Sequence, residues 1–421
     1  MKPATSEPFS LARRNPPGLR QNLSRFAFAV VLPALMRLLC RLSPVCRIPG
    51  TNLVIITGFD STQEVYSRHV DFEVPYEERV KILRWQGFVL ALQDTPEYHD
   101  MYDNISRLWQ PADTTRVQEI ARRTAETILA ETWEELDFIQ DLVKPVLMAI
   151  VEQHYGVTVP DEQLQPFFDG NLAGSGFLFS GPWITKKQRE TGAAAIDGVW
   201  PVLDAAMAAA CANPDPTTVL GRYYSGGPDP AFSEAKLRSA LMTMIGGYLP
   251  TCANASGRIM DVLLSRKDAM QFMQEAVHAK QDDSVLTGLM EALRVNYIIP
   301  FLWRRAAQDT YLGEGTTRRR TVRKGKILAV SLPTAMYDRR RIEHPKRFDP
   351  GRSPAVRMVY GHQFHHCIGA SIANTVLVEM FKAVLTRQPA PARKAKNRKN
   401  RWVGAYPWNL WLALSKASAA P

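Results

Sequence analysis

Apolar residues recur along most of the chain at the three- and four-residue spacing of amphipathic or buried helices. The longest such segment spans residues 236–265, and another spans residues 370–385. Runs with β-like character are short and few, as at residues 53–58 and 326–332. The pattern therefore predicts a mostly α fold with a small β-rich part.

Glycine and proline mark the breaks between these segments. The segment 193–211 is predicted to be one strongly apolar helix, whereas the glycine- and phenylalanine-rich segment 170–181 is predicted to be a loop. The sequence Asp-Thr-Pro-Glu at residues 94–97 offers an N-cap, a first-turn proline and an acidic side chain. It predicts a helix that continues to Trp109.

Pro250 lies in the middle of the predicted helix 236–265, directly before Thr251. A prolyl ring inside a helix removes one backbone hydrogen bond and clashes with the preceding turn, which costs roughly 3 kcal/mol. The pair Gly246-Gly247 precedes it. We expect either a kink with a functional purpose or a packing bend.

The chain has 421 residues, 46% of them hydrophobic, and a net charge of +11 that gathers in clusters of arginine and lysine. Such clusters are solvated faces, or contacts for an anionic membrane or an acidic protein. No recognition motif accompanies them, so no nucleic-acid partner is expected. Five scattered cysteines without CxxC spacing favour reduced thiols and a cytoplasmic protein.

The N-terminal region combines a basic tail with an apolar segment. Residues 1–23 are polar and basic, and residues 26–40 are largely apolar but contain Pro33 and Arg37. These 15 residues are fewer than the roughly 20 that span a bilayer. The segment predicts an amphipathic helix that covers the core or rests peripherally on a membrane surface.

Candidate chemistry centres on Cys367, which stands between a glycine- and histidine-rich loop and the apolar helix 370–385. The loop reads Tyr-Gly-His-Gln-Phe-His-His-Cys-Ile-Gly from Tyr360 to Gly369. A thiolate at the start of a helix, flanked by glycines that let the backbone approach a flat ligand, suits an axial ligand of haem iron. The alternative is a structural buried cysteine beside a surface histidine cluster.

Two further motifs precede this loop. Glu291 and Arg294 lie three residues apart and can pair on one helix face, and a Pro-x-Arg-Phe sequence follows at residues 345–348. In order and spacing these motifs resemble the cytochrome P450 superfamily, most strongly over residues 235–385. The resemblance implies one catalytic domain over residues 24–421, with haem b between the long oxygen-side helix and the helix after the cysteine.

The resemblance also implies roles for individual residues. Cys367 would be the axial ligand of the haem iron, held in a loop shaped by two glycines. His365 and Arg304 would lie beside the propionates, and Tyr98, His99, Arg107 or Trp109 would contact them from the opposite side. Gly361 and Gly369 would shape the loop, and Arg347 would be the partner of the Glu291–Arg294 pair. One departure is Gln363 at a position where the family has glycine, which is costly if the backbone there needs a positive φ.

The oxygen-side helix departs further from the family pattern. Thr251 keeps the usual hydroxyl, but Pro250 stands where an acid is usual, and the acid and the alcohol together relay protons during O–O cleavage. Three hypotheses remain open: a monooxygenase with an altered proton route, an isomerase or dehydratase of hydroperoxides in which Asn254 orients the substrate, and a haem-binding protein without catalysis.

Substrate and partner are predicted only by class. The substrate is expected to be an apolar organic molecule in a pocket lined by Trp85, Phe88, Tyr248 and Leu249. Electrons would come from a ferredoxin- or flavodoxin-type donor on a basic face behind the cysteine, around Arg357 and His362 and extending toward Arg339–Arg341.

Overall fold

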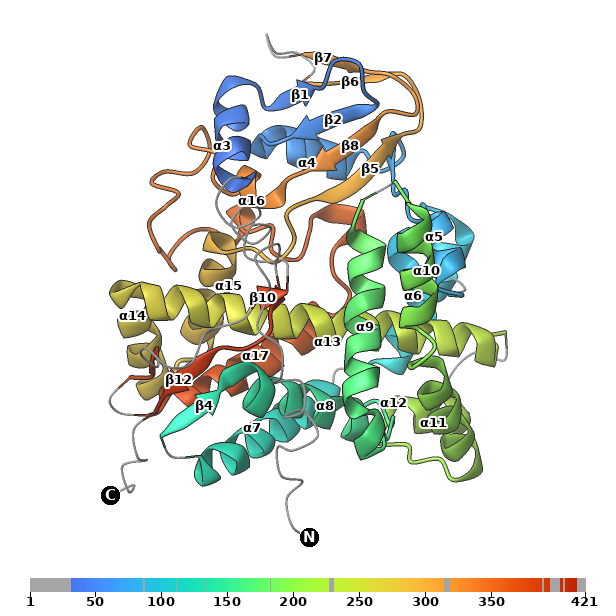
Figure 1. Cartoon of the computed structure of the whole chain (residues 1–421), viewed down its shortest axis with the longest axis vertical. Helices are drawn as coiled ribbons and strands as arrows, with labels where there is room; N and C mark the ends of the chain where they lie inside the picture. The colour runs from blue at the N-terminus through green and yellow to red at the C-terminus, as the bar shows by residue number, and fades with distance from the viewer. Residues whose placement is uncertain are drawn as a thin grey trace.

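The structure is a computed structural model that describes residues 32–414, except 86–87, 111, 133, 182, 227–230, 314–318, 388–389, 394–401 and 404–405. The predicted tail at residues 1–23 lies outside the described residues. Helices form most of the molecule and gather on one side of a smaller part that contains the main sheet (Figure 1). The predicted mostly α fold with a small β-rich part is confirmed.

The helices have the following bounds. They are α3 (Leu32–Leu42), α4 (Phe59–Ser67), α5 (Glu77–Ile82), α6 (Pro96–Leu108), α7 (Asp113–Glu131), α8 (Lys144–Gln153), α9 (Leu164–Phe179), α10 (Lys186–Ala195), α11 (Trp200–Ala212), α12 (Val219–Tyr224), α13 (Glu234–Ser265), α14 (Lys267–His278), α15 (Asp282–Val295), α16 (Leu332–Ala335) and α17 (Ala370–Leu385).

The main sheet has five strands in the order β1-β2-β8-β5-β3. Its strands are β1 (Val45–Arg47), β2 (Leu53–Ile56), β8 (Ile327–Val330), β5 (Leu302–Ala306) and β3 (Phe72–Glu73). Strand β8 is buried along its whole length, between β2, to which it runs parallel, and the antiparallel β5. A strand buried on both faces is uniformly apolar, which explains why β8 gave a clear β-like run.

Smaller sheets complete the β-rich part. Strand β6 (Thr310–Leu312) pairs with β7 (Arg320–Val322), and β10 (Trp402–Val403) pairs with β11 (Tyr406–Pro407). A third small sheet joins β4 (Glu135–Asp137), β12 (Trp411–Ala413) and β9 (Ala392–Arg393).

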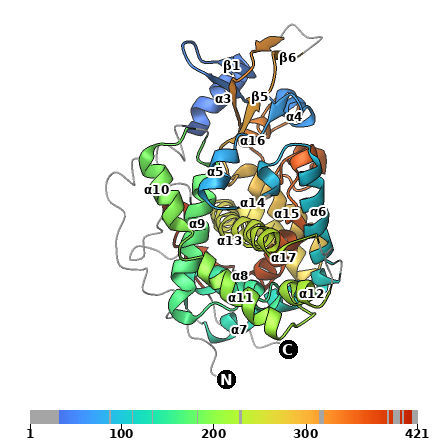
Figure 2. The same ribbon diagram turned by 90° about the vertical axis from the view of Figure 1, so that its right-hand side faces the viewer.

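Helix α13 crosses the centre of the molecule, and Figure 2 looks nearly along its axis. It packs against α8, α9, α15 and α17, so most of its side chains are buried. Ser233 caps its N-terminus by accepting a hydrogen bond from the Lys236 N–H at 3.4 Å. The helix continues through Pro250, and its bounds lie within two residues of the predicted ones.

The predicted loop at residues 170–181 is wrong, because most of this segment lies in α9. At Gly170 the absence of a side chain serves close packing rather than a turn. A Cβ atom at Gly170 would lie 2.5 Å from the Ala195 carbonyl oxygen, at the end of α10. Glycine is therefore required here because two helices touch, and the sequence alone does not distinguish that role from a loop.

The single helix predicted over residues 193–211 is also wrong. The structure divides this region into α10 and α11, with residues 196–199 between them and Pro201 in the first turn of α11. Among the described residues, Lys186–Ala212 is the one segment long and apolar enough, by length and composition, to cross a membrane. Its division into two helices and its partial burial favour a core segment.

Candidate functional site

A cavity of about 380 Å³ lies between α13, α6, β5 and the loop that precedes α17. Aromatic and aliphatic side chains form most of its wall, and eight tyrosines contribute to it. Among the described residues, none that line it is an aspartate or a glutamate. The cavity therefore suits a largely apolar ligand. Its described wall residues offer no carboxylate that could bind a cation or carry a proton.

Cys367 lies at the base of this cavity, where the loop turns into α17. Its backbone N–H donates to the Tyr360 carbonyl oxygen at 2.9 Å, which closes the loop. Burial raises the pKa of the Cys367 thiol, and a hydrogen bond from the Gly369 backbone opposes that rise. A thiol held this way becomes a thiolate most readily when a cation binds it, as in coordination to a metal.

Arg304 from β5 and His365 are among the nitrogen-bearing side chains that line the cavity beside this loop. Among the described residues, neither Arg304 Nε nor His365 Nδ1 has a hydrogen-bond partner, although both atoms are buried. The other ring nitrogen of His365 lies 3.0 Å from the Leu92 carbonyl oxygen. Burial, and then the charge of Arg304, lower the pKa of His365 to about 4.

These features form a site for an anionic group next to a thiol. Buried polar atoms without partners are uncommon in folded proteins and indicate a missing ligand or water. The two carboxylates of haem would give Arg304 a partner and would favour the protonated form of His365, whose Nδ1–H would then donate to them, and the thiol of Cys367 would face the iron. The residues present therefore fit the predicted haem.

Tyr98 of α6 is placed differently from the prediction. Its hydroxyl donates to the Phe364 carbonyl oxygen at 3.1 Å, and its ring lies 4.3 Å from that of Phe364. Tyr98 thus ties α6 to the cysteine loop while its ring still borders the cavity. Because the Tyr98 hydroxyl already donates its proton to the loop, we assign Tyr98 a positioning role rather than a direct contact with haem.

The two loop glycines serve different purposes. Gly361 has φ +80°, and a Cβ atom there would lie 3.3 Å from the His365 carbonyl oxygen, so glycine is required by conformation. Gly369 has φ −87°, which any residue adopts, and stands at the N-cap of α17. Gln363 has φ +55°, so the position where the family has glycine does carry the backbone cost.

We expect Gln363→Gly to stabilise the protein by about 0.5–1 kcal/mol. A left-handed conformation costs a side-chain-bearing residue roughly 1–2 kcal/mol, and glycine's extra unfolded-state freedom offsets part of that gain. Urea unfolding measures the change. The control, Gln271→Gly in the helical interior of α14, should destabilise by about 1 kcal/mol. Equal losses in both variants would contradict the prediction.

The cavity face of α13 carries Thr251 and Tyr248, as predicted. The Thr251 hydroxyl donates back to the Gly247 carbonyl oxygen and lies 3.4 Å from the Tyr248 carbonyl oxygen. Cys252 also borders the cavity, and no sequence signal singled it out. The hydroxyl of Tyr248 is buried without a partner among the described residues, which leaves it available to a bound molecule.

Leu249 and Asn254 do not line the cavity. Successive helical residues turn by about 100°, so Leu249 lies on the far side of α13 from Thr251 and is fully buried there. The Asn254 amide donates to the Ile298 carbonyl oxygen at 3.4 Å and accepts from Arg258 Nε at 2.9 Å. Both predictions are therefore wrong, and Asn254 is a structural residue.

Trp85 and Phe88 line the cavity, as predicted, with ring centroids 4.7 Å apart. A buried arginine, Arg79, joins their region to the end of α9. It donates to the Phe177 carbonyl oxygen at 2.5 Å, to Ser180 Oγ at 3.1 Å and to the carbonyl oxygens of Gly181 and Trp183. One guanidinium thus fixes the segment that follows α9 beside the cavity.

We expect Arg79→Lys to lower the free energy of unfolding by about 1–2 kcal/mol. A lysine keeps the charge but cannot donate along two edges of a planar fork, so buried carbonyl groups lose partners. Hydrogen exchange should rise first at residues 177–183. Arg84→Lys, on an exposed arginine paired with Asp197, is the control and should change little. Unchanged exchange at residues 177–183 in Arg79→Lys would refute the assignment.

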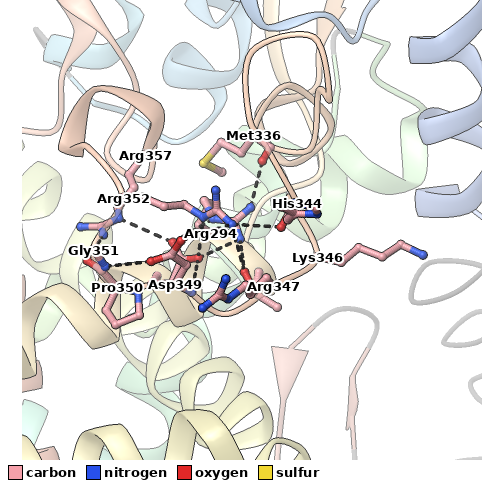
Figure 3. Close-up of polar contacts among 12 residues, drawn as sticks. Arg294, Met336, His344, Lys346, Arg347, Asp349, Pro350, Gly351, Arg352 and Arg357 are labelled. Atoms are coloured by element: carbon pink, nitrogen blue, oxygen red, sulfur yellow. Dashed lines mark hydrogen bonds and ion pairs between the residues drawn. The ribbon is translucent and has the colours of Figure 1, made fainter.

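Behind the cysteine loop, Glu291 and Arg294 of α15 pair at 2.8 Å with both side chains fully buried, as predicted. Figure 3 shows Arg294 at the centre of this group of polar contacts. The prediction that the Arg347 guanidinium is the partner of this pair is wrong. Its side chain is exposed, and its backbone carbonyl oxygen accepts from Arg294 at 3.2 Å. Arg352 supplies the guanidinium instead, 3.3 Å from Glu291.

Arg357 belongs to the same cluster. Its Nε lies 3.6 Å from Glu291, and its side chain is 7% exposed. The prediction that Arg357 forms part of a basic docking face is therefore wrong. His362 is half-buried and remains near that surface. The sequence could not separate arginines that neutralise Glu291 from arginines that face solvent.

The chain is similar in sequence and in fold to known proteins. No family model matches the chain. The polyketide biosynthesis cytochrome P450 PksS of Bacillus subtilis is 26% identical over 157 residues, which cover 37% of this chain and 36% of PksS. The steroid C26-monooxygenase of Mycobacterium tuberculosis is 25% identical over 257 residues, covering 61% of this chain and 65% of that protein.

Solved structures agree over a longer stretch. P450BioI, crystallised with an acyl carrier protein that carries hexadec-9Z-enoic acid, aligns with a TM-score of 0.76 over 93% of this chain and 99% of its own, at 17% identity. The crystal structure of PksS aligns with a TM-score of 0.75 over 93% of this chain and 98% of its own. The sequence matches span only about one to two thirds of these first curated relatives, whereas the fold is shared nearly end to end.

Proposed function

Because the chain belongs to the cytochrome P450 superfamily, we propose that it is a haem-thiolate monooxygenase that oxidises an apolar organic substrate. The observation that carries the proposal is the position of Cys367 at the base of an apolar cavity, beside the unpartnered nitrogens of Arg304 and His365. Haem b is the cofactor that this donor set suits.

Each part of the site has a task in this proposal. Haem, when bound, supplies the redox chemistry that activates dioxygen and oxidises the substrate. Cys367 would hold it as a thiolate, and the Gly369 backbone N–H would stabilise the sulfur charge. Arg304 would neutralise propionate charge, and His365 would donate a hydrogen bond to a propionate once that charge favours its protonated form. Trp85, Phe88 and Tyr248 exclude water from the substrate side and select apolar molecules.

The route by which protons would reach the site departs most from the family pattern. Pro250 replaces the usual acid, and no carboxylate lines the cavity among the described residues. Thr251 offers a hydroxyl whose proton points to the Gly247 carbonyl oxygen, so it must rotate or exchange with water to donate toward the cavity. Water held by Thr251 would then carry protons.

The same observation supports a second candidate function. An isomerase or dehydratase of organic hydroperoxides receives oxygen already reduced to the peroxide level, so it needs no acid relay and no electron donor. The absence of a cavity carboxylate among the described residues favours this candidate. Asn254 cannot orient the hydroperoxide, because its amide is bonded elsewhere; Tyr248 would do so.

The test uses the purified haem-loaded protein. A monooxygenase consumes dioxygen when a ferredoxin- or flavodoxin-type donor and its reductase supply electrons, and consumption rises when substrate is added. A hydroperoxide isomerase converts a fatty-acid hydroperoxide without reductant and without dioxygen uptake. A haem protein that turns over neither would leave only the binding function.

A further inference from the structure

Helix α3 exposes apolar side chains to solvent. The exposed fractions of Leu35, Leu38 and Leu42 are 48%, 51% and 74%. Their spacing of three and four residues puts them on one stripe of the helix, while Met36 and Cys40 face the protein and are about 5% exposed. Among the described residues, six large hydrophobic side chains are recorded as exposed, so this one helix carries half of them.

A basic pocket of about 190 Å³ lies between α3 and residues 334–346. The residues that line it include Arg37, Arg41, Arg339, Arg340 and Lys346, with Asp338 as the acid. Arg340 Nη2 and the Phe59 N–H already neutralise Asp338, at 2.7 and 3.0 Å. Figure 3 shows Lys346 extending away from the Glu291 cluster, so its charge is free for this pocket.

The arginines of α3 lie on the edge of the leucine stripe. With a turn of about 100° per residue, Arg37 and Arg41 fall between the buried face and the exposed leucines. Among the described residues, Arg37, Arg41, Arg339 and Lys346 have no ion-pair partner. The surface therefore joins an apolar stripe to four positive charges without an ion-pair partner in the described part of the chain, of which Arg37 stacks on the Tyr337 ring at 4.4 Å. Helix α3 lies at the end of the molecule opposite α7 (Figure 1).

We propose that the α3 surface binds an anionic lipid bilayer, with the three leucines in the acyl boundary and lipid phosphates in the basic pocket. An interfacial helix needs an apolar stripe flanked by cations, which is the arrangement seen here. Anionic headgroups also attract each nearby lysine or arginine. The inference goes beyond the proposed oxidation chemistry and does not depend on it.

The charge of this surface disfavours two other candidate occupants, the N-terminal segment and a second copy of the chain. Residues 1–25 carry five basic side chains and one acidic side chain, so like charge disfavours their contact with the basic pocket. Residues 26–31 are apolar, and the hydrogen-exchange measurement below tests whether they cover the leucines. A second copy of the chain would bring the same positive surface to the contact. An anionic bilayer satisfies both the leucines and the arginines, and the basic N-terminal segment would strengthen that attraction.

The experiment is sedimentation of the full chain with vesicles of phosphatidylcholine, with and without phosphatidylglycerol. Binding is expected with phosphatidylglycerol, and it should weaken as salt rises. Leu35→Asn with Leu38→Asn should weaken binding at least about tenfold, and Arg339→Gln with Lys346→Gln several-fold. Inorganic phosphate should release the protein no better than chloride of equal ionic strength, because the pocket alone does not hold it.

Control variants remove an aliphatic side chain or two positive charges from other parts of the surface. Val70→Asn takes away an aliphatic side chain that is 68% exposed beyond the C-terminal end of α4, and Arg123→Gln with Lys267→Gln removes two exposed charges. Both should bind vesicles like the parent chain. Equal binding by the leucine variant would overturn the proposal, as would loss of binding in the controls to the same extent.

Two other results would also overturn it. A parent chain that dimerises, with dimers lost in the leucine variant, would assign the face to a second copy. Absence of vesicle binding, with α3 amides strongly protected from hydrogen exchange in the full chain, would assign the face to the N-terminal residues. Circular dichroism of every variant verifies folding before these comparisons.

Discussion

Replacing Cys367 by serine is expected to abolish the thiolate signature in the carbon-monoxide difference spectrum and to lower oxidation activity by more than about 100-fold. Loss of an outer-shell partner of a metal ligand already costs 10–100-fold, and here the ligand itself is exchanged. A serine hydroxyl is a far poorer anion than a thiol at neutral pH. Absorbance of the reduced, carbon-monoxide-treated protein measures the effect directly.

Cys252→Ser is the matched control. Cys252 borders the same cavity from α13, and its thiol is buried, so burial raises its pKa strongly. It differs from Cys367 in standing inside a helix, where no backbone N–H of a following turn faces the sulfur. The control should keep the thiolate signature. An unchanged spectrum in Cys367→Ser, or a loss in Cys252→Ser, would move the ligand to the other cysteine.

Local sequence determined the features that local physics controls. The bounds of α17 agree with the prediction, because a glycine-rich loop and a continuous apolar segment mark its start and its length. The Glu291–Arg294 pair was predictable from its i,i+3 spacing together with the order of the family's motifs, because the spacing by itself also fits a solvated surface pair. Cys367 was predictable because its loop combines glycines, histidine and one thiol in a motif of known family.

Features that depend on helical phase were not predictable. Helix α13 is apolar almost all round, so its sequence gives no stripe from which to decide that Thr251 faces the cavity and Leu249 does not. The glycines of α9 presented the converse problem. Gly170 is needed for contact with α10, a requirement that appears only once both helices are placed.

The direction of side chains in loops could not be predicted from the sequence either. His344 has φ +43°, and this turn precedes the segment that presents the Arg347 carbonyl oxygen, rather than its guanidinium, to Arg294. Arg352, at the end of an Asp-Pro-Gly-Arg sequence, then reaches Glu291. A second arginine close to the Pro-x-Arg-Phe sequence was the one available signal, and the family pattern directed attention to the first.

Replacing Glu291 by alanine is expected to destabilise the protein by about 3–5 kcal/mol. Glu291 is fully buried and faces three guanidinium groups, from Arg294, Arg352 and Arg357. Removing one partner of a buried ion pair leaves the others as uncompensated buried charges. Because the cluster lies against residues 344–352, which lead to the cysteine loop, haem retention should fall together with stability. Urea unfolding and the haem-to-protein absorbance ratio measure the two effects.

Controls separate burial from charge. Glu119→Ala breaks contacts of a half-exposed carboxylate with Arg122 and Arg123 on the surface of α7, and solvent screening should keep its effect on stability small. Arg352→Gln should destabilise more than Arg347→Gln, since only the first removes a guanidinium from Glu291. The reverse order would restore Arg347 as the partner. Similar losses for Glu291→Ala and Glu119→Ala would mean that the buried cluster contributes no more than a surface pair, and the stability of the cysteine loop would then rest on apolar packing of α15 and α17.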